Sequence, residues 1–384
     1  MTRLPLKTNV YDEAVARMQS LYDEGHRIVV SYSGGKDSHV CMEICITAAT
    51  KAGRLPVEVL TRDEEIMFPG TFELCERTRE RPEVDFHWIW AEQPIVNVFN
   101  REQPYFWPFD DRLDPEDWVR KPPPYAYKIP DLNLKHMVVP DRFPPPPGKN
   151  LITVIGLRGA ESNRRLMGIH NSGGFLTKSP VAGAYHARPL YDWQDGDVWL
   201  AHKIFDWDYN AAYDVMMRMG VPRHRLRIAP PTLSVNGATK LQLAAKAWPQ
   251  WFDRVANRLP GVRAVAQFGT IAISPTRQMG ETWAETYQRE CIDTAPKWIS
   301  ERSAVVREVI ERRHAGHAST PIPDITPCRH CTGAIVSWKK MAKIMYLGDP
   351  LSVATDYLGL PDIEPEQFRP GSGVWYPEGR ERKK

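Results

Sequence analysis

Long hydrophobic runs are absent from this 384-residue sequence. The longest apolar stretches, such as 28–30 and 151–155, are far too short to cross a bilayer. The opening residues MTRLPLKTNV also lack the apolar core of a secretion signal. We therefore expect a cytoplasmic protein that has no membrane partner.

A strong charge of one sign is also absent. The 50 lysines and arginines are nearly balanced by 47 aspartates and glutamates, which leaves a net charge of +3 at pH 7. A protein that binds nucleic acid over a broad surface usually carries a larger basic excess, so any such surface here must be local. Composition neither requires nor excludes a nucleic-acid partner.

Cysteine is scarce, with six residues in the whole chain. This number excludes the dense disulfide framework of a small secreted domain. Cys41, Cys45 and Cys75 fall in predicted helices, where we expect them to be packing residues. Only Cys328 and Cys331 are spaced as two ligands of one metal would be.

The sequence does contain alternating amphipathic and β-branched segments. This alternation predicts an α/β fold with a parallel sheet. Helices are expected at 10–23, 39–49 and 71–79, and strands at 27–32, 57–61, 86–90 and 151–157.

Two regions are expected along the chain. Residues 1–235 form the α/β domain, and residues 236–384 form a mostly helical C-terminal region that contains the two spaced cysteines. A proline- and aromatic-rich insertion at about 104–148 is longer than a plain connection. It is either a lid over a substrate or an ordered surface loop.

The loop Ser33-Gly34-Gly35-Lys36-Asp37-Ser38 lies between a predicted strand and a predicted helix. Two glycines let backbone N–H groups surround a phosphate, and the helix N-terminus adds partial positive charge. The serine hydroxyls can donate hydrogen bonds, Lys36 can neutralise phosphate, and Asp37 can hold Mg²⁺ or cap the helix. A plain turn explains the glycines but not the whole set.

A second block, Gly156-Leu157-Arg158-Gly159-Ala160-Glu161-Ser162, closes another predicted strand and is followed by Arg164 and Arg165. Guanidinium groups can form paired hydrogen bonds with phosphate or sulfate oxygens. Such a cluster is often only a solvated face, but its place at the end of a strand in a parallel sheet favours ligand binding. A third block ends the second strand with Asp63, which is placed to bind ribose or metal.

These blocks resemble the phosphoadenosine phosphosulfate (PAPS) reductase-like superfamily of PP-loop ATP pyrophosphatases. The first loop is similar to their SGGxDS signature, the second block to their GxRxxES motif, and Phe68-Pro69 stands where they carry Phe-Pro. The branch of immunoglobulin-binding regulator A-like proteins of bacteria and phages is similar over most of 10–235. Its matching stretches include 63–65, 107–110, 118–120, 189–193, 197–199 and 209–210.

The resemblance implies an adenine nucleotide alpha hydrolase-like core that binds ATP or PAPS with Mg²⁺. Lys36, Asp37, Arg158 and Arg164 are implied as catalytic residues. The implied nucleotide-binding residues are Ser31, Tyr32, Ser33, Gly34, Gly35, Lys36, Asp37, Ser38, Asp63, Gly156, Leu157, Arg158, Glu161 and Arg165.

The implied reaction is cleavage of ATP to AMP and pyrophosphate, which activates an acceptor. The acceptor stays open between DNA, RNA and a small molecule, and a thiol or sulfur donor protein is an expected partner. PAPS reductases attack with a cysteine in a Glu-Cys-Gly-Leu-His segment, whereas here Glu290-Cys291 is followed by Ile292-Asp293. The alternatives are therefore a true PAPS reductase, which this departure disfavours, and a nucleotide-binding regulator without turnover.

The segment Cys328-Arg329-His330-Cys331 is a candidate metal site. Zinc takes four ligands, and sulfur-transferring relatives of the PP-loop type use three-cysteine iron–sulfur clusters. A redox dithiol and a pair of inert thiols are the other interpretations. Cys291, His314, His317 and His330 are candidates for the remaining ligands, and the expected set is Cys291, Cys328, His330 and Cys331.

Overall fold

The computed structural model describes residues 8–129, 137–228, 237–331 and 336–369. The chain divides into two compact units, one made of 1–93 and 120–230 and the other of 94–119 and 231–384. The domain boundary expected at 235 lies outside the described residues. Among the described residues, no helix is long and apolar enough to cross a membrane.

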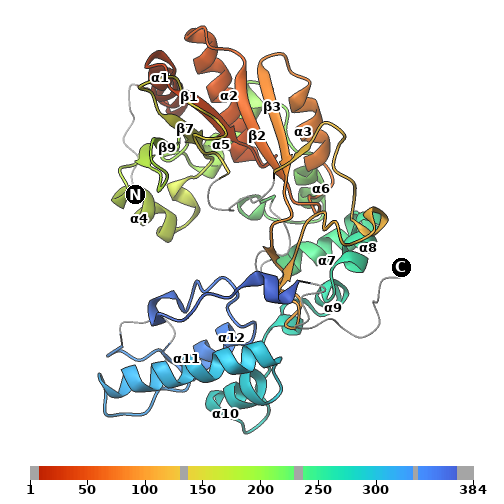
Figure 1. Ribbon diagram of the computed structural model, residues 1–384, viewed down its shortest axis with the longest axis vertical. Helices are drawn as coiled ribbons and strands as arrows, with labels where there is room; N and C mark the ends of the chain where they lie inside the picture. The colour runs from red at the N-terminus through yellow and green to blue at the C-terminus, as the bar shows by residue number, and fades with distance from the viewer. Residues whose placement is uncertain (1–7, 130–136, 229–236, 332–335, 370–384) are drawn as a thin grey trace. The chain divides into compact units, whose positions relative to one another are not determined.

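A seven-stranded sheet in the order β6-β3-β2-β1-β7-β9-β8 forms the centre of the first unit (Figure 1). Every neighbouring pair is parallel except β8 and β9, so the expected parallel α/β fold is confirmed. The strands are β1 (Arg27–Ser31), β2 (Val57–Asp63), β3 (Val84–Trp90), β6 (Tyr127–Lys128), β7 (Leu151–Val154), β8 (Leu176–Lys178) and β9 (Ala184–Ala187).

Both faces of this sheet are buried, which explains the continuous apolar runs of its central strands. Successive residues of a strand point to opposite faces. Val30 accordingly belongs to the core that includes Met42 and Ile44 of the second helix, whereas Val29 belongs to the core on the other face with Leu60 and Leu151. The helices of this unit are α1 (Val10–Asp23), α2 (Lys36–Lys51), α3 (Thr71–Arg79), α4 (Asn163–Asn171), α5 (Asp195–Ile204) and α6 (Ala212–Arg218).

The order of the strands reverses beside β1. From β1 the chain continues to β2 and β3 on one side, and it returns to β7 on the other side. In doubly wound sheets, ligands bind where the strand order reverses, outside the carboxyl ends of the strands. The loop after β1 and the block after β7 therefore flank the point at which a ligand site is expected.

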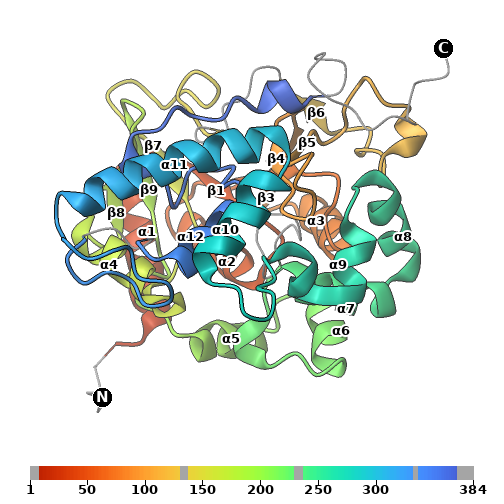
Figure 2. The same ribbon diagram turned by 90° about the horizontal axis from the view of Figure 1, so that it is seen from below.

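The second unit is mostly helical. Its α-helices are α7 (Gly237–Ala247), α8 (Pro249–Arg258), α9 (Val262–Phe268), α10 (Trp283–Tyr287), α11 (Lys297–Ala315) and α12 (Trp338–Met345). Figure 2 shows α10, α11 and α12. Tyr287 of α10, Val306 of α11 and Met341 of α12 are fully buried in one apolar core. A short hairpin of β4 (Ile95–Val96) and β5 (Tyr105–Phe106) also belongs to this unit.

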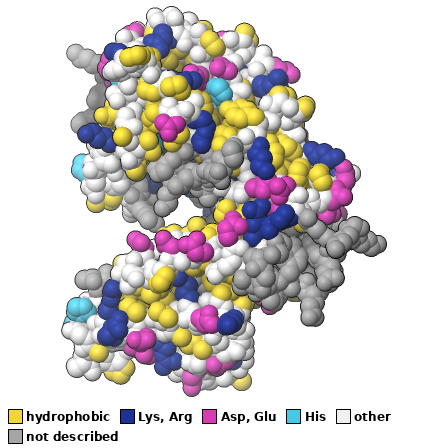
Figure 3. Space-filling view, viewed as in Figure 1, with side chains coloured by type: hydrophobic (Ala, Val, Ile, Leu, Met, Phe, Trp, Pro, Cys, Tyr) yellow, Lys and Arg dark blue, Asp and Glu magenta, His cyan; other side chains and the backbone are white. Residues whose placement is uncertain are grey.

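Short 3₁₀ and π segments complete the two units. They are η1 (Pro115–Asp117), η2 (Gly159–Glu161), η3 (Arg223–Arg225), η5 (Gly269–Ile273), the π-helical η6 (Gln288–Asp293), η7 (Asp356–Leu358) and η8 (Pro365–Phe368). On the face drawn in Figure 3, acidic and basic side chains are interspersed, in agreement with the small net charge.

The proline-rich insertion expected at 104–148 is divided between the two units. Residues 104–119 belong to the second unit and the described part of 120–148 to the first. Hydrogen bonds explain the first assignment, because Tyr105 donates to the Pro350 carbonyl at 2.6 Å and Arg258 Nη2 donates to the Trp107 carbonyl at 2.7 Å. Residues 104–119 are thus held by residues of the second unit that lie much later in the sequence.

Candidate functional site

The Ser33–Ser38 loop follows β1 and leads directly into α2. Ser38 holds the loop closed, because its hydroxyl accepts from the Ser33 amide at 3.2 Å and donates to the Gly35 carbonyl at 3.0 Å. Gly34 has φ +66°, and a Cβ there would lie 2.7 Å from the Thr71 methyl group. Only glycine satisfies both restrictions.

Two residues that follow the sheet in the sequence, Asn210 and Tyr213, form hydrogen bonds with the backbone of this loop. The Lys36 amide donates to the Tyr213 hydroxyl at 3.0 Å. The Asn210 side-chain amide donates to the Gly34 carbonyl at 3.1 Å and to the Thr71 hydroxyl at 2.8 Å. Asn210 and Tyr213 were not among the expected site residues. Asn210 belongs to the stretch 209–210, which resembles the family, but the sequence assigned no role to it.

The block after β7 lies against the first turn of α2. A Cβ built on Gly156 would lie 3.0 Å from the carbonyl carbon of Asp37 and 3.0 Å from the Ser38 nitrogen. Both are backbone atoms of a helix and cannot move independently. Glycine at this position therefore permits the two predicted blocks to meet.

Two basic and two acidic side chains form a compact cluster beneath the loop. Lys36 Nζ lies 2.9 Å from Asp37 Oδ2 and 3.4 Å from Asp195 Oδ1. Arg158 Nε donates to Asp37 Oδ1 at 2.5 Å, and its Nη2 lies 3.4 Å from Asp195 Oδ1. Lys36 and Arg158 are buried, and each is matched by carboxylates that keep its charge compensated. Asp195, at the start of α5, was missed in the sequence.

A cavity of about 340 Å³ opens above this cluster. The two predicted blocks supply most of its lining, and Tyr213, Arg227 and Ile228 complete it. Asp37, Glu161 and the exposed Arg165 and Arg227 are the charged residues of its lining, and Arg165 forms an ion pair with Glu161. Its lining from the two blocks is Ser31, Ser33, Gly35, Asp37, Ser38, Ile155, Gly156, Glu161 and Arg165.

A second cavity of about 240 Å³ shares Ser31, Ser33 and Ile228 with the first. Its walls are largely apolar and include the side chains of Tyr32, Leu60, Met67 and Phe68. Arg62 also lines it, with its Nη2 3.7 Å from Glu64 Oε1. Burial lowers the pKa of Arg62, and its Nε and Nη2 make no hydrogen bond with any described residue.

Asp63 does not face either cavity, contrary to the expected ribose or metal role. Its carboxylate is fully buried and accepts from the Trp88 indole at 3.0 Å and from the Glu65 amide at 2.9 Å. Arg120 also pairs with it. Side chains alternate along β2, so Arg62 points into the cavity while Asp63 points to the opposite face and holds the following segment in place.

The other expected residues are divided between lining and support. Of the expected nucleotide-binding residues, eight line the larger cavity and Tyr32 lines the smaller one. Neither cavity is lined by Gly34, Lys36, Leu157 or Arg158. The side chain of Arg164 lies outside the described part of the chain. Lys36 and Arg158 do not line the cavity themselves, but both contact Asp37, which does.

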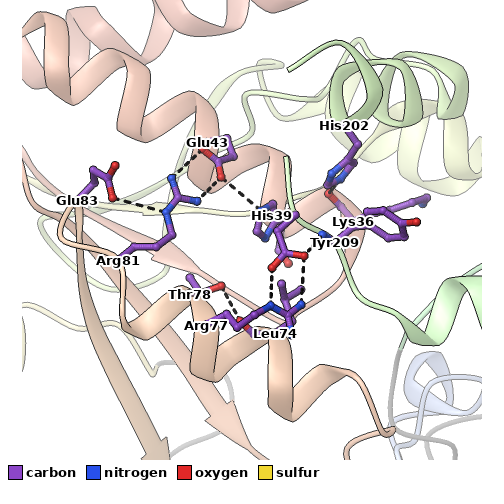
Figure 4. A network of polar contacts seen from close by, with 12 residues as sticks. Lys36, His39, Glu43, Leu74, Arg77, Thr78, Arg81, Glu83, His202 and Tyr209 are labelled. Carbon is purple, nitrogen blue, oxygen red and sulfur yellow. Dashed lines mark hydrogen bonds and ion pairs between the residues drawn. The ribbon is translucent and has the colours of Figure 1, made fainter. Parts of the chain in front are cut away.

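A buried polar network supports the first half of α2 (Figure 4). Tyr32 and His39 are joined at 2.8 Å between the hydroxyl and Nδ1, and His39 Nε2 lies 3.3 Å from Glu43 Oε1. Arg81 pairs with Glu43 through two nitrogens. His202 stacks on His39 with ring centroids 5.6 Å apart and donates from Nε2 to the Lys36 carbonyl at 3.2 Å. The network fixes the helix that carries the loop.

The expected metal ligands are only partly brought together. Cys328 and Cys331 lie near each other and near His314, whereas Cys291 and His330 are not in that group. Cys291 is fully buried, and its sulfur lies 3.6 Å from the Ala342 carbonyl. Cys291 is therefore a packing residue in the apolar core of the second unit. The histidine that lies beside Cys328 and Cys331 is His314, and not the expected His330.

Comparison with known proteins identifies a family for this chain. The family model described as the phosphoadenosine phosphosulfate reductase domain matches residues 27–219. The uncharacterised protein YbdN of Escherichia coli K12 is 25% identical over 248 residues, which cover 60% of this chain and 60% of YbdN. The chain therefore matches less than two thirds of that relative's length.

Solved structures give weaker similarities. Candida glabrata FMN adenylyltransferase, in complex with FMN and an ATP analogue, is 15% identical with a TM-score of 0.34, and the match covers 55% of this chain and 64% of that one. The PAPS reductase of Candida auris is 12% identical with a TM-score of 0.30, covering 56% and 94%. Similarities at these scores carry no functional information for this chain.

Gly156→Ala should destabilise the first unit by about 1–3 kcal/mol, because the added methyl group would press on helix backbone. The matched control is Gly196→Ala in α5, where a Cβ meets nothing within 4 Å. That change should be neutral or stabilising, since alanine favours a helix. Urea unfolding of both variants measures the difference, and equal stabilities would contradict the close approach.

The Glu43 network predicts a specific response to acid. Burial would raise the pKa of Glu43, but His39 and Arg81 outweigh it and hold the pKa below its ordinary value. The ionised carboxylate therefore stabilises the fold above the unfolded pKa of about 4.3, and this stabilisation is lost as pH falls through the folded value. Glu43→Gln should be less stable than wild type at pH 7, and the gap should close below about pH 4.

Chemical denaturation at several pH values measures that gap. The exposed Glu80→Gln at the end of α3 is the control, and it should show no pH-dependent gap. A gap for Glu43→Gln that stays constant from pH 7 to pH 3 would mean that the carboxylate charge is not what stabilises the network.

Proposed function

Because the chain belongs to the phosphoadenosine phosphosulfate reductase domain family, we propose that it is an enzyme that binds ATP or PAPS and cleaves ATP to AMP and pyrophosphate. The cleavage would activate an acceptor, for sulfur transfer or for modification of DNA, RNA or a small molecule. The observation that carries the proposal is a cavity that both glycine-containing blocks line, at the point where the strand order reverses.

The two adjoining cavities suit the two halves of an adenine nucleotide. The apolar cavity, with Tyr32, Leu60 and Phe68, offers surfaces for a planar base. The larger cavity offers the N-terminus of α2 and the exposed Arg227 for phosphates. Ser31 and Ser33 line both, so a nucleotide would lie along the loop from one to the other.

The acidic residues of the larger cavity fit a bound Mg²⁺. Asp37 and Glu161 both face it, and carboxylate oxygens are the protein ligands that Mg²⁺ prefers. When bound, Mg²⁺ would neutralise charge on the phosphates. Lys36 and Arg158 orient Asp37 by holding both of its carboxylate oxygens.

Catalysis in this proposal consists of positioning and charge compensation. The N-terminus of α2 favours the negative charge of the phosphates, and the exposed Arg227 balances it. An acceptor oxygen forms a bond to the α-phosphorus, and the bond from that phosphorus to the pyrophosphate oxygen breaks. Pyrophosphate leaves with the electron pair, and a sulfur or nitrogen nucleophile could then displace AMP.

Reduction of PAPS is the less favoured alternative. Its chemistry requires an accessible thiolate. Burial raises the pKa of Cys291 to about 12, so this thiol stays protonated at neutral pH within the apolar core. The regulator without turnover is disfavoured because the complete Ser33–Ser38 loop and its charge cluster are present.

Lys36→Ala should weaken MgATP binding about 10- to 100-fold, since its loss removes a cation worth about 1.5–3 kcal/mol and leaves Asp37 and Asp195 undercompensated beside the phosphates. Titration calorimetry measures the affinity. Lys51→Ala, an exposed change in the last turn of the same helix, is the control and should bind as wild type does. Equal affinities for all three proteins would refute the assignment of the loop.

The products distinguish the proposed reaction from its alternatives. With ATP and Mg²⁺ alone, water takes the place of the acceptor and attacks the α-phosphorus, so we expect AMP and pyrophosphate in equal amounts. Arg158→Ala should lower their rate of formation about 10- to 100-fold because Asp37 loses its partner. Chromatography of the nucleotides measures this. Sulfite and adenosine 3′,5′-bisphosphate formed from PAPS and a thiol would instead support the reductase, and tight binding without products would support the regulator.

A further inference from the structure

Three side chains that can bind metal converge in the second unit, apart from the nucleotide cavities. His314 lies in the last turn of α11, and Cys328 and Cys331 lie in the segment that leads to α12. One donor atom from each lies within 4.8 Å of the other two. Nothing in the proposed nucleotide chemistry uses these residues.

The orientation of the His314 ring is fixed for metal binding. Its Nε2 lies 2.7 Å from the Thr320 carbonyl, which can only accept, so Nε2 carries the hydrogen. In the neutral ring, Nδ1 then presents its lone pair, and Nδ1 lies 3.2 Å from Cys331 Sγ. Metal-bound histidines typically donate their other N–H to such a carbonyl or carboxylate.

The segment that holds the two cysteines is tied to the helix that follows it. The Cys328 amide donates to the Val336 carbonyl at 2.8 Å, which ties the segment to the start of α12. The two-residue gap thus brings both sulfurs to the same side as the His314 ring.

We propose that His314, Cys328 and Cys331 bind one Zn²⁺ ion through Nδ1 and two thiolates. This donor set of one imidazole nitrogen and two sulfurs is typical of tetrahedral zinc. The fourth position is left to a solvent molecule. An iron–sulfur cluster is disfavoured because it needs further thiolates, and the Cys291 sulfur is directed to the Ala342 carbonyl instead.

The position of the site indicates what the ion does. His314 ends α11, and the cysteine segment precedes α12, so one ion would join the ends of two helices that share an apolar core. Val306, Ile310 and Met341 are fully buried in that core. Zinc binding would therefore stabilise the second unit, because the ligands come together only in the folded chain.

The test uses the full chain, purified without added metal and measured for zinc by mass spectrometry. Wild type should contain about one zinc per chain, and the double variant Cys328→Ser, Cys331→Ser should contain none. His314→Ala should weaken zinc binding at least about tenfold, whereas His314→Cys should retain the ion. Cys291→Ala and His330→Ala are the matched controls, and each should keep one zinc.

A second measurement does not depend on the variants folding. After chelation of wild type, Co²⁺ should produce the visible absorption of a tetrahedral ion with thiolate ligands, and Zn²⁺ should abolish it. Zinc should also raise the unfolding temperature of the chelated protein. The proposal would be overturned if wild type neither contained nor took up zinc, or if it contained iron with sulfide absorption. It would also be overturned by a Cys328–Cys331 disulfide without metal, or by a loss of zinc in His330→Ala equal to that in His314→Ala.

Discussion

The close approach of the chain after β7 to the first turn of α2 is the constraint on which the candidate site depends. Gly156 lies against the backbone of Asp37 and Ser38, where any Cβ would be within 3.0 Å of two main-chain atoms. This approach places Arg158 beside Asp37 and closes one wall of the larger cavity. A sheet whose strand order reverses between β1 and β7 makes the meeting possible, because both loops then leave the same edge.

Charge compensation follows from that meeting. Lys36 and Arg158 would be costly to bury alone, but they share Asp37 and Asp195. These carboxylates compensate the charges of Lys36 and Arg158, and Glu161 pairs with Arg165, which leaves the exposed Arg227 to attract an anionic ligand. The polar network joins His39 and Glu43 of α2 to Arg81, which follows α3, and so helps to fix the helix that carries the loop (Figure 4).

Local patterns were sufficient to predict the parallel sheet, the Ser33–Ser38 loop and the block around Gly156, because each has its own chemical signature in a few consecutive residues. The supports of the loop have no such signature. Tyr213 reaches the Lys36 amide across 177 positions, and neither its type nor its neighbours indicate this contact. The position of Asp63 could not be predicted for a different reason. Strand periodicity puts Arg62 and Asp63 on opposite faces of the sheet but does not say which face holds the ligand site. Likewise, the cysteine spacing marked Cys328 and Cys331, while the choice of His314 over His330 required the fold.

Hydrogen–deuterium exchange with and without MgATP tests the central claim most directly, because it locates the nucleotide without depending on any variant or any acceptor. The account predicts slower exchange in peptides that cover 31–38 and 155–165, and no change in peptides that cover 314–331. Protection confined to the second unit, or MgATP binding that leaves both glycine-containing blocks unprotected, would contradict it.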